Sequence, residues 1–329
     1  MAIDPAELAV VASRYPIGEI EHIRPLASDR PQRAHAALQT DEGRFIVKRR
    51  ETRDPPRERI MASNRNAWLS ELREFGVPAV RPLREFSGEA VTILELDIAL
   101  EVQPMAHGLR PSDTPEAAAE AGRVLALLHD VPSPVDVTRP GVTTWHDAPT
   151  VPASLRSLAA AMPDTRAEVL TLTERYIRAA KRAATAPAKN ICPLHGDWHP
   201  GNILVDSAGS ITAIFDFDQA RIGPRTEDIA SGALHFMGEI DADPTRALDR
   251  LTAFLTAYDQ TAAENRKPLH RAERNALPWL MVEALIAEVP SLAARQAGNS
   301  STQRTLLASI DRRAEAIERA AEGIGSIIR

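Results

Sequence analysis

The sequence feature that most constrains the fold lies in residues 194–220, which read LHGDWHPGNILVDSAGSITAIFDFDQA. Asp197 stands five residues before Asn202, and a second acid, Asp216, ends a mostly apolar run. The Gly, Pro and His residues around Asp197 predict an irregular loop. The β-favouring residues 203–205 predict a strand that begins directly after Asn202. The fold must therefore bring together a loop acid, an amide and an acid at the end of a strand.

An acid, an amide and a second acid in this order suit phosphoryl transfer from Mg-ATP. Asp197 would accept the proton of a substrate hydroxyl, while Asn202 and Asp216 would hold Mg²⁺, which prefers oxygen ligands and keeps several waters. Asp, Asn and Gly are also common turn residues, so turn formation would explain any one of them alone. The ordered set favours the chemical interpretation over the turn interpretation.

Length and composition limit the class of protein. A chain of 329 residues is long for one compact domain, and its 44% apolar and 26% charged residues are ordinary for a globular protein. The net charge of −6 argues against a nucleic-acid partner, because such proteins usually carry a basic stripe. Cys192 is the only cysteine, so no intrachain disulfide can form, and a structural thiol in a cytoplasmic protein is expected. Residues 1–15 lack a signal-peptide pattern, and no membrane association is expected.

The order of elements predicts two lobes. Before residue 104 we expect a helix at 5–15, strands at 20–26, 33–40 and 44–49, a helix at 57–75, and strands near 90–95 and 99–103. Later come helices at 115–130, 166–186, 227–236, 244–257, 271–288 and 302–328, a long loop at 135–152, and short strands at 203–206 and 211–215. We therefore predict an α+β fold with a small antiparallel-sheet lobe over residues 1–103, a connector at 104–108 and a mainly helical lobe over 109–329.

The segments LHGDWHPGNIL and IFDFDQA resemble the motifs of the aminoglycoside phosphotransferase and choline-kinase-like superfamily, relatives of the protein kinases. The resemblance covers nearly the whole chain and implies a bilobal, protein-kinase-like fold. It implies a small-molecule kinase in which Asp197 is the catalytic base and Asn202 and Asp216 bind Mg²⁺. It also implies that His195 and Asp228 brace the catalytic loop.

The same resemblance indicates a nucleotide site for ATP. A lysine on a strand should neutralise phosphates, and the segment RFIVK at 44–48 makes Lys48 the candidate. The connector should offer backbone groups to adenine at Gln103 and Met105. Leu204 and Phe215 would be apolar neighbours of the base, although ordinary core packing explains each of them equally well.

Two features depart from the family pattern. The turn expected to cover the phosphates, residues 27–33, contains no glycine, so backbone cradling of phosphate is not predicted there and Ser28 is the alternative donor. The helix acid that partners the lysine would fall near Arg65, which is not acidic; Glu58 and Glu71 are the substitutes, and a lysine without such a partner stays open. These departures keep a second reading open, a catalytically inactive pseudokinase that serves as a nucleotide-binding or scaffold protein. The acceptor, expected to be an aminoglycoside, sugar or amino alcohol, and the oligomeric state are not predicted further.

Overall fold

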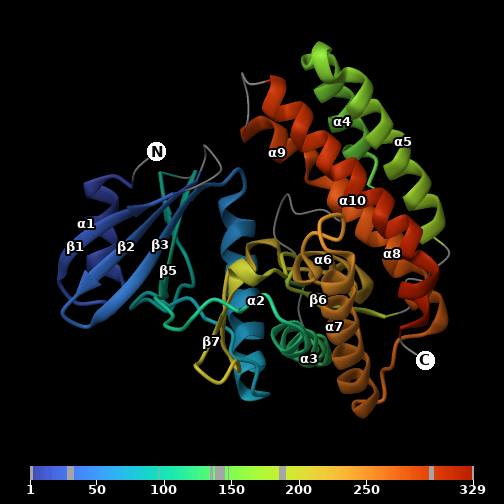
Figure 1. Cartoon of the computed structure of the whole chain (residues 1–329). Coiled ribbons are helices and arrows are strands. Elements are labelled where there is room, and N and C mark those ends of the chain that lie inside the picture. The colour runs from blue at the N-terminus through green and yellow to red at the C-terminus, as the bar shows by residue number, and fades with distance from the viewer. Residues whose placement is uncertain are drawn as a thin grey trace.

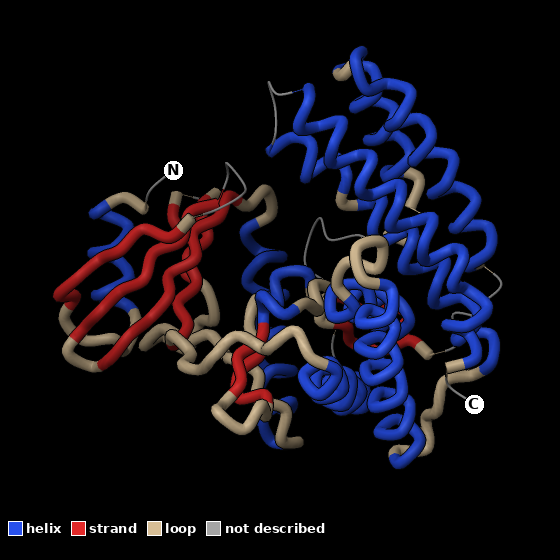
Figure 2. The backbone as a smooth tube through the Cα atoms, viewed as in Figure 1, coloured by secondary structure: helices blue, strands red, loops and turns tan. Residues whose placement is uncertain are grey.

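The structure is a computed structural model that describes residues 3–27, 33–95, 97–133, 136–137, 145–146, 148–184, 190–295 and 300–327. Figure 1 shows an antiparallel sheet on one side of the molecule and a large group of helices on the other. The sheet has five strands, and Figure 2 shows a few short strands among the helices as well. The predicted α+β fold class is confirmed.

The sheet part begins with helix α1 and three strands joined as hairpins. Strand β3 is central and pairs with both β2 and β5, which gives the strand order β1-β2-β3-β5-β4. The elements are α1 (Pro5–Arg14), β1 (Ile20–Leu26), β2 (Arg33–Thr40), β3 (Gly43–Glu51), α2 (Pro55–Glu74), β4 (Thr92–Leu94) and β5 (Ile98–Pro104).

Alternation along β3 separates the core of the sheet part from its functional face. Val47 is fully buried in a cluster with Leu8 and Val11 of α1. The next residue, Lys48, must point to the opposite face, because successive side chains of a strand alternate. Lys48 lies between His35 on β2 and Glu101 on β5 in the strand register. The hydrophobic core under α1 therefore fixes which side chains face the helical part.

The helical part contains two small two-stranded sheets set among helices. Strand β6 (Ile191–Leu194) pairs with β9 (Arg221–Pro224), and β7 (Ile203–Val205) pairs with β8 (Ile211–Ile214). The helices are α3 (Pro115–Asp130), α4 (Thr150–Ala161), α5 (Arg166–Ala183), α6 (Arg225–Met237), α7 (Pro244–Glu264), α8 (Arg271–Ala287), α9 (Val289–Arg295) and α10 (Ser300–Ser326), with short 3₁₀ turns η1 (Pro163–Thr165), η2 (Pro200–Asn202) and η3 (Phe217–Gln219). Helices α5, α8 and α10 lie alongside one another (Figure 1).

Helix α2 belongs to both parts of the molecule. It follows the first three strands in sequence, yet Trp68, Leu69 and Leu72 are buried in the same cluster as the helical core. The ring of Trp68 meets Phe217 edge to face, with the ring centroids 5.7 Å apart. Movement of α2 therefore cannot be independent of the segment that follows β8.

Some elements differ from the sequence-based prediction. Helix α4 begins inside the loop expected at 135–152, much of which lies outside the described residues, and it continues where no element was predicted. The pairing of β6 with β9 was also not predicted. The segment Arg271–Ala294 is long and apolar enough to cross a membrane by composition, but 67% of its most apolar window is buried inside the protein. Burial in the helical core explains that composition. The proposed boundaries of the two lobes stay a prediction.

Candidate active site

The loop between β6 and η2 carries Asp197 and is held from below by Asp228. The backbone N–H groups of His195 and Gly196 donate to the Asp228 carboxylate at 2.6 and 2.9 Å. Gly196 has φ of +81°, and a Cβ there would lie 2.1 Å from the carbonyl oxygen of Gln219. Only glycine fits this turn without a shift of the backbone. The contacts of Asp228 match the bracing role that the resemblance implied.

His195 is fully buried and connects the loop to the end of β8. Its Nδ1 accepts the N–H of Asp197 at 3.2 Å, so the proton sits on Nε2, which donates to the carbonyl oxygen of Phe215 at 3.1 Å. Burial lowers the pKa of His195 and outweighs the acids around it, Asp228 first among them. The imidazole therefore stays neutral and keeps both hydrogen bonds near neutral pH.

Asp197 is ionised and accessible. The amide nitrogen of Asn202 donates to the Asp197 carbonyl oxygen at 3.0 Å and to its Oδ2 at 3.2 Å. His199 accepts the N–H of Gly201 on Nδ1, so its Nε2 carries the proton and faces Asp197 Oδ1 at 3.6 Å. Burial alone would raise the pKa of Asp197, but His199, with smaller contributions from His195 and Asn202, more than offsets this and lowers it. With 41% of its side chain exposed, the carboxylate can meet a ligand as a base.

Asn202 and Asp216 lie side by side because of the β7–β8 pairing. The N–H of Phe215 donates to the carbonyl oxygen of Asn202 at 3.1 Å, and Asp216 follows directly in a left-handed conformation with φ of +67°. The Asn202 amide nitrogen turns toward Asp197, which leaves its Oδ1 for a cation. One amide oxygen and one carboxylate fit Mg²⁺, which keeps waters and takes phosphate oxygens as further ligands. Within the described ranges, no group of three or more His, Cys, Asp or Glu side chains could hold a metal alone.

Lys48 extends from the sheet to two acids of the helical part, Asp216 and Asp218. Its Nζ lies 2.6 Å from Asp216 Oδ1 and 3.6 Å from Asp218 Oδ1. Burial acts to lower the pKa of Lys48, but Asp218, Asp216 and Glu101 outweigh it, so the pKa is raised and the amine is charged. Lys48 thus has carboxylate partners, although neither is a helix acid.

The Glu58–Lys48 pair, one of the alternatives that the sequence left open, is not found among the described residues. Glu58 of α2 instead accepts a hydrogen bond from Arg50 Nε at 3.0 Å. Arg65 of α2 forms a buried ion pair with Glu101 on β5, directly opposite Lys48 in the sheet. In the Arg65–Glu101 pair the helix carries the cation and the strand carries the acid, the reverse of the expected arrangement, whereas the Glu58–Arg50 pair keeps the acid on the helix. Sequence reasoning missed this role of Glu101, whose only signal was a single acid within a mostly apolar strand.

The four residues expected around adenine differ in burial and in the groups that they leave for a ligand. Gln103 is buried on β5 opposite Ile46. The N–H of Met105 donates to the carbonyl oxygen of Arg44 at 2.9 Å, so its carbonyl oxygen, rather than its N–H, is the group left for a base. Leu204 and Phe215 are both half-buried.

The glycine of the connector explains how closely it approaches β7. A Cβ on Gly108 would lie 2.9 Å from both Leu204 Cβ and the carbonyl oxygen of Val205. Leu109 also exchanges backbone hydrogen bonds with Val205, at 2.8 and 2.9 Å. The connector is therefore fastened to the strand that starts at Asn202, and Leu204 lies against it.

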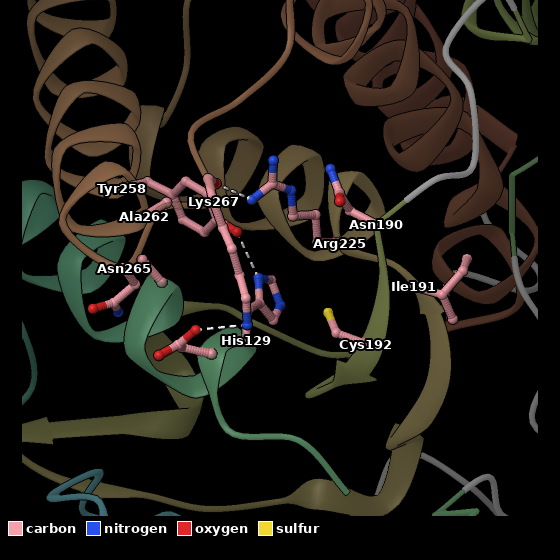
Figure 3. Close-up of a pocket in the computed structure, with 11 residues that line it drawn as sticks. His129, Asn190, Ile191, Cys192, Arg225, Tyr258, Ala262, Asn265 and Lys267 are labelled. Carbon is pink, nitrogen blue, oxygen red and sulfur yellow. Dashed lines mark hydrogen bonds and ion pairs between the residues drawn. The ribbon is translucent and has the colours of Figure 1, made fainter.

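A cavity of about 140 Å³ lies behind the loop that carries Asp197 (Figure 3). His129 lines it and contacts Asp228 at 3.2 Å through Nε2 and the Tyr258 hydroxyl at 2.9 Å through Nδ1. The cations there are paired: Arg225 with Glu273 and, nearer the surface, Lys267 with Asp130. Burial raises the pKa of the Cys192 thiol, which also lines the cavity, far above its usual range. These groups support the loop from behind, and the raised pKa of Cys192 agrees with the sequence prediction of a structural thiol.

Comparison with known proteins gives the family. The family model described as the phosphotransferase enzyme family matches residues 22–264. No curated protein matches the chain.

Solved structures of small-molecule kinases share the fold. An amicoumacin kinase in complex with AMP-PNP, Ca²⁺ and Ami is 17% identical with a TM-score of 0.72, over 96% of this chain and 94% of that one. A spectinomycin phosphotransferase in complex with ADP and spectinomycin is 15% identical with a TM-score of 0.64, over 97% and 99%. A microcompartment-associated aminopropanol kinase is 18% identical with a TM-score of 0.64, over 97% and 98%. These likenesses and the family match confirm the resemblance seen in the sequence, and the chain belongs to the phosphotransferase enzyme family.

Proposed function

We propose that this enzyme transfers the γ-phosphate of ATP, with Mg²⁺, to a hydroxyl group of a small molecule. The observation that carries the proposal is the Lys48–Asp216 ion pair, with Nζ 2.6 Å from Oδ1. It joins a cation of the sheet to the proposed metal-binding acid of the helical part. Asp216 is in turn tied through Phe215 to Asn202, whose amide holds Asp197. A phosphate-binding cation, two metal ligands and a base thus surround one space.

Each residue has a role that follows from its contacts. Asp197 accepts the hydroxyl proton as the oxygen attacks the γ-phosphorus and the bond from that phosphorus to ADP breaks, and its lowered pKa keeps it ionised before the step. His199 Nε2–H faces the same carboxylate and orients it. Bound Mg²⁺ would offset the charge on the phosphoryl oxygens. Asp216 now holds Lys48; once that carboxylate is a metal ligand, Lys48 Nζ is available to the phosphate oxygens.

The acceptor is proposed to be an aminoglycoside, a sugar or an amino alcohol. The names of the similar structures support this range, since they are kinases of amicoumacin, spectinomycin and aminopropanol. A row of polar side chains leads away from the base: the ring of His199 lies 5.5 Å from that of His235, and His235 Nε2 lies 3.3 Å from Glu288. Such a row can bind hydroxyl and amino groups. We place the acceptor beside it.

The test measures Mg-dependent ATP turnover against a panel of amino alcohols, sugars and aminoglycosides. Asp197→Asn should lower kcat by about 10²- to 10⁴-fold, because general-base catalysis is worth that much. ATP affinity should change little, since the substitution keeps the size of the side chain. Asp206→Asn is a matched control, because Asp206 caps the exposed β7–β8 turn instead. Full activity of Asp197→Asn would refute the mechanism, whereas tight ATP binding with no turnover on any acceptor would favour a pseudokinase.

A further inference from the structure

The face of the sheet that carries Lys48 also carries Arg33, a cation that neither the sequence motifs nor the proposed function has used. Arg33 is the first residue of β2 and lies two residues before His35, which pairs with Lys48 in the strand register. Because side chains alternate along a strand, Arg33 and His35 share a face of the sheet with Lys48. We propose that Arg33 is a second phosphate-binding residue of the nucleotide site. This inference rests on the proposed function.

Asp218 brings the two cations to one place. Arg33 Nη1 donates to Asp218 Oδ2 at 3.1 Å, and Lys48 Nζ lies 3.6 Å from Asp218 Oδ1. The Asp218 side chain is 6% exposed, and it stands two residues after the proposed metal ligand Asp216. A buried carboxylate thus holds an arginine and a lysine over the space that the nucleotide phosphates would occupy.

The pKa of His35 also indicates that these charged groups lie close together. Burial is the main cause that lowers the pKa of His35, and the charges of Lys48 and Arg33 lower it further against Asp216 and Asp218. All four charged groups therefore lie close enough to act on one imidazole. This supports the geometry, which stands on the contacts of Asp218.

Arginine suits a phosphate site whose turn has no glycine. Glycine-rich turns bind phosphate through backbone N–H groups, but residues 27–33 contain no glycine. A guanidinium presents five N–H donors in a planar fork that matches phosphate oxygens. Among the described residues, the contact of Arg33 with Asp218 uses Nη1 alone. Nε and Nη2 can therefore bind a phosphate while Asp218 keeps the side chain in position.

The charge balance agrees with this role. Without nucleotide, the two cations Lys48 and Arg33 face the two carboxylates Asp216 and Asp218. When Asp216 serves as a metal ligand, Asp218 is the one of these two carboxylates that still pairs with both cations. Lys48 then loses the shorter of its two ion pairs, and its charge is available to a polyphosphate. The ligand that this site fits is the β- and γ-phosphate portion of a nucleoside triphosphate.

Binding of ATP, ADP and AMP should be measured by titration calorimetry in the presence of Mg²⁺. Arg33→Gln should weaken ATP and ADP binding by about 10- to 100-fold, because it removes charge-assisted hydrogen bonds. AMP binding should change by less than about twofold. Arg33→Lys should give an intermediate loss, since it keeps the charge but not the fork. Arg59→Gln is the matched control, because Arg59 of the same part of the chain also pairs with a carboxylate, Glu89, but at an exposed site.

The outcomes separate the inference from the proposed function. Equal ATP affinity of wild type and Arg33→Gln would overturn the inference and leave the proposed function standing. An equal loss for AMP and ATP would show a structural effect and also overturn it; the melting temperature of each variant identifies that case. If the wild-type protein binds no ATP, the inference and the proposed function fail together.

Discussion

The reversed ion pair between α2 and β5 predicts an unequal response to the loss of its two partners. Glu101 and Arg65 are 3% and 2% exposed at their side chains. Glu101 has a second cation, because Arg50 Nη2 lies 3.5 Å from its Oε2. Arg65 forms no other ion pair within the part of the chain that the structure describes. The two substitutions Glu101→Gln and Arg65→Met therefore leave different charges unpaired.

The magnitudes follow from what remains buried after each substitution. Glu101→Gln leaves Arg65 without a carboxylate in a buried site, which should cost about 3–5 kcal/mol. Arg65→Met leaves Glu101 with Arg50 and with the charge of Lys48, which also lowers its pKa. The loss should then be that of a charge-assisted hydrogen bond, about 1.5–3 kcal/mol. In the Arg65→Met background no cation is left stranded, so Glu101→Gln should cost about 2 kcal/mol less than it does alone.

Urea unfolding followed by tryptophan fluorescence measures all four corners of this cycle. Trp68 lies on α2 one turn after Arg65 and is fully buried, so it reports the loss of this helix. The m-value must stay constant for the comparison to hold. If Arg65→Met costs as much as Glu101→Gln, or if the two effects add within about 0.5 kcal/mol, the assignment of the stranded charge is wrong.

Two further predictions concern protonation. His199→Ala should raise the pKa of Asp197, because His199 is the main group that lowers it against burial, and the acidic limb of the kcat/KM pH profile should move to higher pH; an unmoved limb would contradict this. The pKa values of His129 and His195 are lowered by burial, so their neutral forms stabilise the fold fully above the unfolded value near 6.5. That stability should be lost as pH falls below about 6.5, by up to about 1.4 kcal/mol per pH unit for each histidine, and melting temperatures between pH 7 and pH 5 check it; a flat profile would show that these histidines do not titrate with unfolding.

Much of the fold could be predicted because its signals are local. The strands at 20–26 and 33–40 and the helix at 115–130 have the bounds that periodicity and turn residues indicated. Helix α4 was missed because only Leu155 and Ala159 are buried along it, so its apolar stripe is weak. The β6–β9 pair was missed because each strand has only four residues and the two strands are separated by the whole segment 195–220. No local pattern announces a partner at that distance.

In the site, too, contacts between residues close in sequence could be predicted, and contacts between distant residues could not. The residues of the motif segment could be assigned from their order along the chain, and their contacts run over only a few residues, as between Asn202 and Asp197. The partner of Lys48 could not be assigned, because Asp216 lies 168 residues further along the chain. Alternation shows which face Lys48 occupies. It does not show which of several acids reaches that face.

Helix α2 connects the two parts of the molecule even though none of its acids pairs with Lys48 among the described residues. Its Arg65 is fastened to Glu101 in the sheet, beside Lys48, while Trp68 one turn later packs on Phe217, which directly follows Asp216. Both ends of the Lys48–Asp216 pair are therefore positioned by one helix. Here the helix sets the distance between the cation and the proposed metal ligand, whichever of its residues carries the charge.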